Sequence, residues 1–130
     1  PILPDVRQNE LVRQQVLGDK PVQTWCYYYQ RAELAAQFGH MEDIPPLWEE
    51  AEALGLYPSH GLEYIPFIRA YAYLGDWEAS SSFTKNAQKT SKGMASPLCF
   101  VWREIFQNTP DTHEKESTFT QVQKMLNCVP

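Results

Sequence analysis

The sequence has 130 residues, which is enough for one domain with a core of modest size. Hydrophobic residues make up 43% and charged residues 21%, as in folded chains rather than disordered ones. The net charge of −5 disfavours nucleic acid and anionic lipid as partners, because both need a basic surface. No apolar run approaches the roughly 20 residues of a membrane span, so we expect no direct membrane insertion.

Residues 1–21 are polar and contain three prolines. They begin without Met or an apolar signal core, so we interpret the chain as part of a larger protein or as a processed product. Asp5 is a suitable N-cap for a helix that ends near Leu17, although its apolar stripe is thin. This segment is therefore predicted to be either a linker or a short capping helix.

Two helices joined at Gly39 are predicted within residues 22–55. Thr24 is a suitable N-cap for the first helix, and no Gly or Pro interrupts the sequence before Gly39. Glycine at this place favours the left-handed conformation that ends many helices. The second helix is expected from about Asp43, because Pro45 is tolerated only in a first turn.

The segment 60–92 repeats this design, with its turn at Gly75. A shift of the sequence by 36 residues against itself aligns identical residues at Tyr28 and Tyr64, Ala36 and Ala72, Gly39 and Gly75, Glu42 and Glu78, and Ala51 and Ala87. These matches fall at the turn and on the apolar faces of both helices, which indicates an internal repeat. We expect Gly39 and Gly75 to share a left-handed conformation, and Ala51 and Ala87 to be buried where helices cross.

A third pair of helices is predicted for residues 95–128, and the first of the two is expected to end before Pro110. No segment shows the alternating pattern of a strand. The predicted fold class is all-α, with three antiparallel helix hairpins over about 22–55, 60–92 and 95–128.

The residues at the turns and helix crossings follow the pattern of a known repeat. They are Ala70-Tyr71, Gly75-Asp76-Trp77 and Ala87, with a looser copy at Tyr28, Ala32, Gly39, Trp48, Ala51 and Pro58. This pattern resembles the tetratricopeptide repeat (TPR) over residues 24–92, whereas 93–130 match by helix pattern only; Ile44 and Ser80 replace the alanine that the family prefers. The resemblance implies that residues 22–130 form a TPR-like domain, a short right-handed α-solenoid. The function it implies is a non-catalytic protein-interaction or scaffolding module with a protein or peptide partner.

In this family the first helices of successive repeats line a concave groove. Offsets from the turn glycines place a mixed aromatic and charged set there: Tyr29, Glu33, Ile65, Arg69 and Tyr73, together with Ala36 and Ala72. Some family members clamp C-terminal carboxylates through Lys and Asn, and the residues found here disfavour that activity. Arg69 is suited to one carboxylate. An ion pair with Glu33, or a solvated charge, is the alternative for Arg69.

A second resemblance involves the segments Thr24–Tyr29 and Leu74–Trp77. Both resemble soluble tails of large bacterial membrane proteins of glycosyltransferase type. The alternative function is therefore an accessory or regulatory soluble domain of such an enzyme, attached to a membrane-embedded parent chain. The resemblance does not imply on which side of the membrane the domain would lie.

The three cysteines, Cys26, Cys99 and Cys128, lack a Cys-x-x-Cys spacing. We expect buried free thiols, with a single Cys99–Cys128 bridge as the alternative. The three histidines are far from any cysteine in sequence, so we expect no metal and no cofactor.

No assembled catalytic set is apparent. The acidic run of the second helix is expected to be a solvated face, and Ser80-Ser81-Ser82 lacks the flanking glycines of a nucleophile elbow. The aromatic residues are expected to pack between helices. The run Tyr27-Tyr28-Tyr29 spans roughly 200° of a helix surface, so at least one of its members is expected to face the groove or a neighbouring repeat.

Overall fold

A computed structural model describes residues 23–129, which are helical with no strand in that range. The helices are α2 (Trp25–Gln37), α3 (Ile44–Ala53), α4 (Ile65–Tyr73), α5 (Trp77–Thr90), α6 (Ala95–Asn108) and α7 (His113–Leu126). Two short 3-10 turns, η1 (Met41–Asp43) and η2 (Gly61–Tyr64), lead into α3 and α4. The all-α prediction is confirmed, and the predicted linker or capping helix over 1–21 lies outside the described residues.

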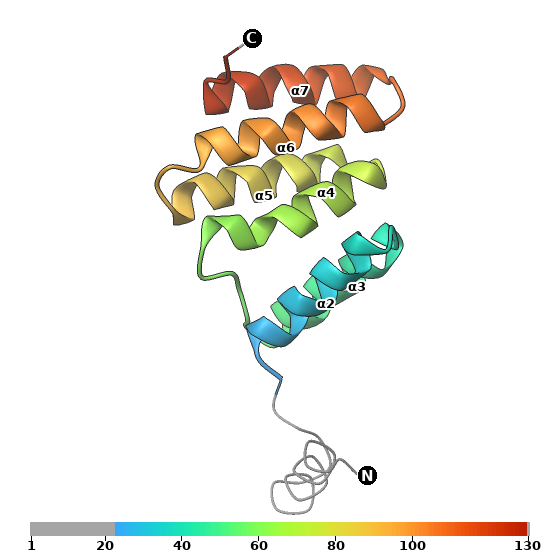
Figure 1. Ribbon diagram of the computed structural model, residues 1–130, viewed down its shortest axis with the longest axis vertical. Helices are drawn as coiled ribbons and strands as arrows, with labels where there is room; N and C mark the ends of the chain where they lie inside the picture. Colours follow the sequence, from blue (N-terminus) through green and yellow to red (C-terminus); the bar gives the residue numbers. More distant parts are fainter. Residues whose placement is uncertain (1–22, 130) are drawn as a thin grey trace, which may run out of the picture.

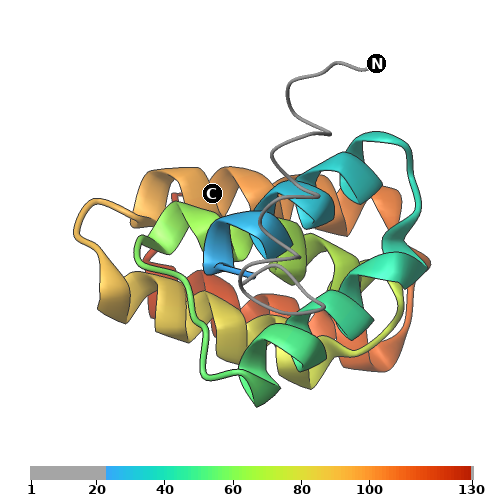
Figure 2. The same ribbon diagram turned by 90° about the horizontal axis from the view of Figure 1, so that it is seen from below.

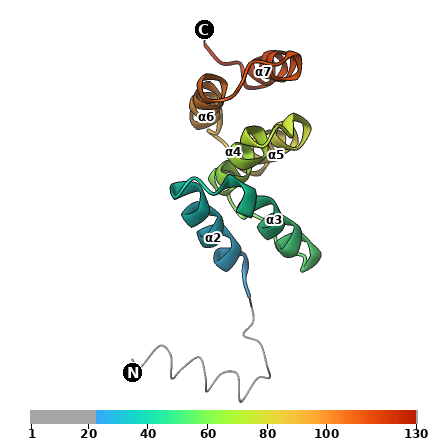
Figure 3. The same cartoon turned by 90° about the vertical axis from the view of Figure 1, so that its right-hand side faces the viewer.

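The helices are stacked in chain order along the long axis of the molecule (Figure 1). Each of α2, α4 and α6 contacts the helix that follows it in sequence, and α4 also contacts α2 and α6. Seen from the side, α2, α4 and α6 lie to one side of α3, α5 and α7 (Figure 3). The pair α2 and α3 forms the near end of the stack when the molecule is seen from below (Figure 2).

The turns after α2 and α4 have the same geometry. Gly39 has φ +76° and Gly75 has φ +88°, so both adopt the predicted left-handed conformation. In each turn the residue after the glycine donates its N–H to the carbonyl five positions back, at 2.8 Å in both cases. These bonds satisfy carbonyls that the end of a helix leaves without partners.

Equivalent elements recur at the predicted spacing. A shift of 36 residues carries α2 onto the range 61–73, which η2 and α4 cover together. Residues 41–53, covered by η1 and α3, shift onto 77–89, which lies within α5. Ala51 and Ala87 are both fully buried, as expected, and Tyr28 and Tyr64 are buried at 0% and 7% exposure.

The core beneath α2 and α4 is aromatic. The ring centroid of Trp48 lies 4.6 Å from that of Phe83 and 5.2 Å from that of Phe67, and both pairs are edge-on. Tyr71 packs edge-on against Phe83 at 5.1 Å. The prediction that these rings pack between helices is confirmed. Edge-on aromatic pairs favour one packing geometry, so these rings fix α3, α4 and α5 relative to one another.

Ser80 stands where the TPR pattern prefers alanine, and its hydroxyl has a structural partner. Ser80 Oγ donates to the carbonyl of Ile68 at 2.7 Å, in the core between α4 and α5. Thr84 Oγ1 donates to the carbonyl of Ser80 at 2.9 Å and accepts from Nε1 of Trp102, also at 2.9 Å. This buried chain of hydrogen bonds connects α4, α5 and α6, and it occupies the hydroxyl of Ser80.

The expectation of three buried free thiols is wrong. Cys99 in α6 and Cys128 after α7 form a disulfide with a Cα–Cα distance of 5.8 Å, and Cys26 is free but exposed. Asn127 adopts a left-handed conformation with φ 57° at the end of α7, and this turn leads directly into Cys128. The bridge that was the alternative therefore joins the last two helices.

Candidate functional site

One cleft brings together all five residues predicted to line a groove. Its volume is about 580 Å³, and its walls come mainly from α2 and α4, with one residue of α6 at the edge. The residues shared with the prediction are Tyr29, Glu33, Ile65, Arg69 and Tyr73, and Ala36 also lines the cleft. Ala72, which was expected there as well, is instead buried in the core at 1% exposure.

Helical spacing places these side chains on the cleft. Tyr29 and Glu33 are four residues apart on α2, and Ile65, Arg69 and Tyr73 follow one another at the same interval on α4. Residues four apart lie on one face of a helix. Because α2 and α4 contact each other, their two faces form the opposite walls of a single cleft.

The tyrosine run divides its side chains among three directions, as its helical spacing requires. Tyr28 is buried, and its hydroxyl lies 3.0 Å from Oε1 of Glu50. The guanidinium carbon of Arg31 lies over the ring of Tyr27, 5.3 Å from the ring centroid. Tyr29 lines the cleft, so one member of the run faces neither the core nor Arg31.

Tyr29 orients the carboxylate of Glu33. Its hydroxyl donates to Oε2 of Glu33 at 2.8 Å. Burial raises the pKa of Tyr29 to about 12, and the hydrogen bond to Glu33 and the charges of Glu33 and Glu63 add to the effect. The hydroxyl therefore keeps its proton near neutral pH and remains a donor. The ring of Trp25 stacks against that of Tyr29 at 6.4 Å, which further restricts the side chain.

Arg69 pairs with a residue that the sequence did not indicate. Its Nη2 donates to Oε1 of Glu104 on α6 at 2.6 Å, and the two side chains are 31% and 38% exposed. Neither an Arg69–Glu33 pair nor a solvated Arg69 is found, so both interpretations are wrong. The missed partner lies in the third helix pair, whose register against the first two could not be assigned from the sequence.

Five further residues, Gln37 among them, line the cleft and were not predicted. Met41, Leu62 and Pro66 contribute apolar surface, and Glu104 contributes a carboxylate. Met41 and Leu62 come from the short turns η1 and η2, which the sequence did not separate from the helices that follow them. In the sequence, only their positions just before α3 and α4 could have indicated that Met41 and Leu62 line the cleft.

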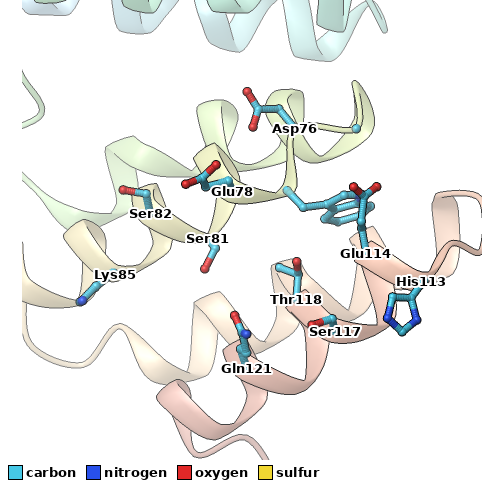
Figure 4. Close-up of a pocket in the computed structure, with 12 residues that line it drawn as sticks. Asp76, Glu78, Ser81, Ser82, Lys85, His113, Glu114, Ser117, Thr118 and Gln121 are labelled. Carbon is cyan, nitrogen blue, oxygen red and sulfur yellow. The ribbon is translucent and has the colours of Figure 1, made fainter.

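A second cleft of about 650 Å³ lies between α5 and α7 (Figure 4). Its lining is polar, with Ser81 on α5 and Thr118 on α7 on its two sides. Asp76 and Glu114 lie near one end of the cleft, and Lys85 lies at the other. Asp76 has a structural role, because its Oδ1 accepts the N–H of Ala79 at 3.1 Å and caps α5.

In this second cleft, the serine run of α5 is not paired with His113 through Ser82. Ser82 and His113 line opposite ends of it, as Figure 4 shows. Within residues 23–129, no group of three or more His, Cys, Asp or Glu side chains is placed to hold a metal ion. The acidic residues of α3, including Glu49 and Glu52, are exposed, in agreement with the predicted solvated face.

A third, smaller hollow of about 380 Å³ lies beside α2 and α3. Leu34 and Phe38 border it and are 53% and 66% exposed. Arg31 and Asp43 flank this apolar surface with opposite charges. It is smaller than the α2/α4 cleft, and its one close charged contact is exposed, with Nδ1 of His40 4.0 Å from Oδ2 of Asp43.

Comparisons with protein-family models, with curated proteins and with solved structures found no match to this chain. In the part of the chain that the structure describes, no helix combines the length and apolar character needed to cross a bilayer.

Proposed function

We propose that this chain is a non-catalytic protein-interaction or scaffolding module, and that it binds a protein or peptide in the cleft between α2 and α4. The observation that carries the proposal is the convergence of Tyr29, Glu33, Ile65, Arg69 and Tyr73 on that cleft. Tyr and Arg are enriched among the interface residues whose truncation costs the most binding energy. The cleft combines these residue types with apolar surface and with polar groups that are already oriented.

The proposed architecture is a short TPR-like, right-handed α-solenoid of three antiparallel hairpins. Two observations support it. The elements of the first pair recur after 36 residues, and the turns at Gly39 and Gly75 share one hydrogen-bonding pattern. The helices α2, α4 and α6 also lie together on one side of the stack (Figure 3). In such a stack, a cleft between first helices is open to an extended or helical segment of a partner.

The test begins with a selection of binders from a random peptide library displayed on phage, using the full chain as bait. Selected peptides are then measured against the double variant Tyr29→Ala/Arg69→Ala. Because this variant removes one aromatic ring and one guanidinium from the cleft, we expect at least about tenfold weaker binding. A melting curve and a circular dichroism spectrum establish that the double variant remains folded.

The matched control is Tyr57→Ala/Arg103→Ala. It removes the same two residue types from exposed positions that do not line the cleft. Binding to this control should equal binding to the parent chain. Equal loss in both double variants, or full binding to Tyr29→Ala/Arg69→Ala, would overturn the proposed site.

A further inference from the structure

We infer that the α2/α4 cleft receives a basic side chain, Lys or Arg, from its protein partner, with the carboxylate of Glu33 as the counter-charge. The inference rests on the proposed function and assigns the chemistry of the partner. It follows from the charge of the cleft, the orientation of Glu33 and the apolar surface beneath it.

The charges in the cleft do not balance. Glu33 and Glu104 carry two negative charges, and Arg69 carries the one positive charge among the residues that line it. Arg69 and Glu104 neutralise each other at 2.6 Å. None of the ion pairs within residues 23–129 involves Glu33, which therefore supplies an uncompensated negative charge at this site. The net charge of −5 adds a long-range attraction for basic partners.

The carboxylate of Glu33 is already positioned. Oε2 accepts the hydroxyl proton of Tyr29 at 2.8 Å, and this neutral donor leaves the charge of Glu33 in place. Oε1 has no hydrogen-bond partner among the described side chains, so it is open to an incoming donor. A carboxylate held in this way loses less conformational entropy on binding than a free side chain does.

The rest of the cleft fits the long stem of a basic side chain. Ile65, Leu62 and Met41 provide apolar surface on which the methylene groups of Lys or Arg can lie while the charged head reaches Glu33. The rings of Tyr29 and Tyr73 border the same space. A cation that passes over a tyrosine face gains further electrostatic attraction. An acidic side chain would meet the same apolar surface but would be repelled by Glu33.

The test uses the peptides selected from the random library, measured for affinity against Glu33→Gln. This variant keeps the shape of the side chain and an acceptor for Tyr29 but removes the charge. We expect enrichment of Lys and Arg in the selected peptides and about tenfold weaker binding to Glu33→Gln. The matched control is Glu52→Gln, which removes an exposed charge on α3 outside the cleft and should leave binding nearly unchanged.

A charge reversal sharpens the test. Selection on Glu33→Lys should yield peptides enriched in Asp and Glu, whereas selection on Glu52→Lys should still yield basic peptides. Peptides without an excess of Lys or Arg that nevertheless depend on Tyr29 and Arg69 would overturn the inference and leave the proposed function standing. Basic peptides that lose equal affinity in Glu33→Gln and Glu52→Gln would also overturn it, because the attraction would then be global.

Discussion

Gly61 occupies a position where a larger residue cannot fit. A Cβ atom there would lie 2.6 Å from the carbonyl oxygen of Ala87 and 2.9 Å from Cγ of Met94. The N–H of Gly61 also donates to Oγ of Ser91 at 2.8 Å, which fixes the start of η2 against the end of α5. The sequence marks Gly61 as a helix-end residue only, so its role in this close approach was not predicted.

We therefore expect Gly61→Ala to destabilise the fold. Because the nearest atom is backbone oxygen, it cannot move aside at little cost, and overpacking of this kind costs about 1–3 kcal/mol. The free energy of unfolding in urea measures the effect. The control Ser82→Ala lies at an exposed position on α5 and should change stability by less than about 0.5 kcal/mol. An unchanged unfolding midpoint for Gly61→Ala would contradict the contact.

Lys115 is buried and completes the end of α6. Its Nζ donates to the carbonyls of Phe106 and Thr109 at 2.6 and 2.8 Å and to Oδ1 of Asp111 at 3.2 Å. The same ammonium lies 4.3 Å from the ring centroid of Phe106. All three of its protons have partners, and the charge lies where the negative end of the helix dipole favours a cation.

Lys115→Met is expected to lower the free energy of unfolding by about 2–3 kcal/mol. The substitution keeps a long apolar stem but leaves two helix-end carbonyls without their charged donor. Urea unfolding followed by circular dichroism measures the loss. Lys124→Met, an exposed lysine on α7, is the control and should have little effect. Equal free energies of unfolding in the two variants would show that the hydrogen bonds of Lys115 to the end of α6 contribute nothing to stability.

Two tyrosines link the stability of the fold to alkaline pH. Burial raises the pKa values of Tyr29 and Tyr71 to about 12 from an ordinary value of 10.0. The folded chain then holds more protons than the unfolded chain between these values. The contribution of these raised pKa values to the free energy of unfolding is fully present below pH 10 and is lost as the pH rises towards 12.

Denaturant unfolding across this range, with tyrosinate absorbance recorded in parallel, measures the linkage. We expect Tyr29→Phe to make the loss of stability between pH 10 and 12 less steep, because one of the tyrosines with a raised pKa is removed, while Tyr71 and the buried Tyr28 and Tyr64, whose pKa values are also raised, remain. Tyr57→Phe, at an exposed tyrosine, is the matched control. If the free energy of unfolding falls with pH at the same slope in the parent and in Tyr29→Phe, the pKa of Tyr29 is not raised.

At the scale of elements, local signals in the sequence were sufficient to predict the helices and their turns. Gly39 and Gly75 end their helices because glycine adopts a positive φ without strain, and this depends on no distant contact. The residues of α2 and α4 that line the cleft were expected there from the TPR resemblance, through their offsets from the turn glycines. The Arg69–Glu104 pair and the Cys99–Cys128 bridge both involve α6. The ion pair was missed and the bridge was only the alternative, because both depend on how the third pair packs, which the irregular repeat did not specify.

The disulfide is expected to stabilise the last two helices substantially. It closes a segment of 29 residues, for which the chain-entropy estimate is about 3–4 kcal/mol. Replacement of Cys99 and Cys128 by Ser should lower the free energy of unfolding by up to that amount. Reduction with dithiothreitol should lower it similarly in the parent chain. Cys26→Ser should change nothing, because that thiol is exposed and unpaired. A parent chain whose stability is insensitive to the reductant would contradict the bridge.

At the scale of the whole molecule, the cleft depends on contacts that cross the stack. The α2 wall is held by the indole of Trp25, whose Nε1 donates to Oε1 of Glu63 at 3.0 Å, and by the aromatic core beneath it. The α4 wall is tied to α6 through Arg69 and Glu104. Three successive layers of helix therefore set the width of the cleft, which is a property of the assembled stack.

The most direct test of the central claim, that the α2/α4 cleft is the protein-binding surface, is chemical-shift mapping by nuclear magnetic resonance. A selected peptide is titrated into isotopically labelled chain, and the perturbed amides are placed on the structure. If partners bind in the α2/α4 cleft, the largest changes should cluster at Tyr29, Glu33, Arg69 and Tyr73, with small changes in the α5/α7 cleft. Changes centred on Ser81 and Thr118, or on Leu34 and Phe38, with Tyr29 and Arg69 unaffected, would contradict it.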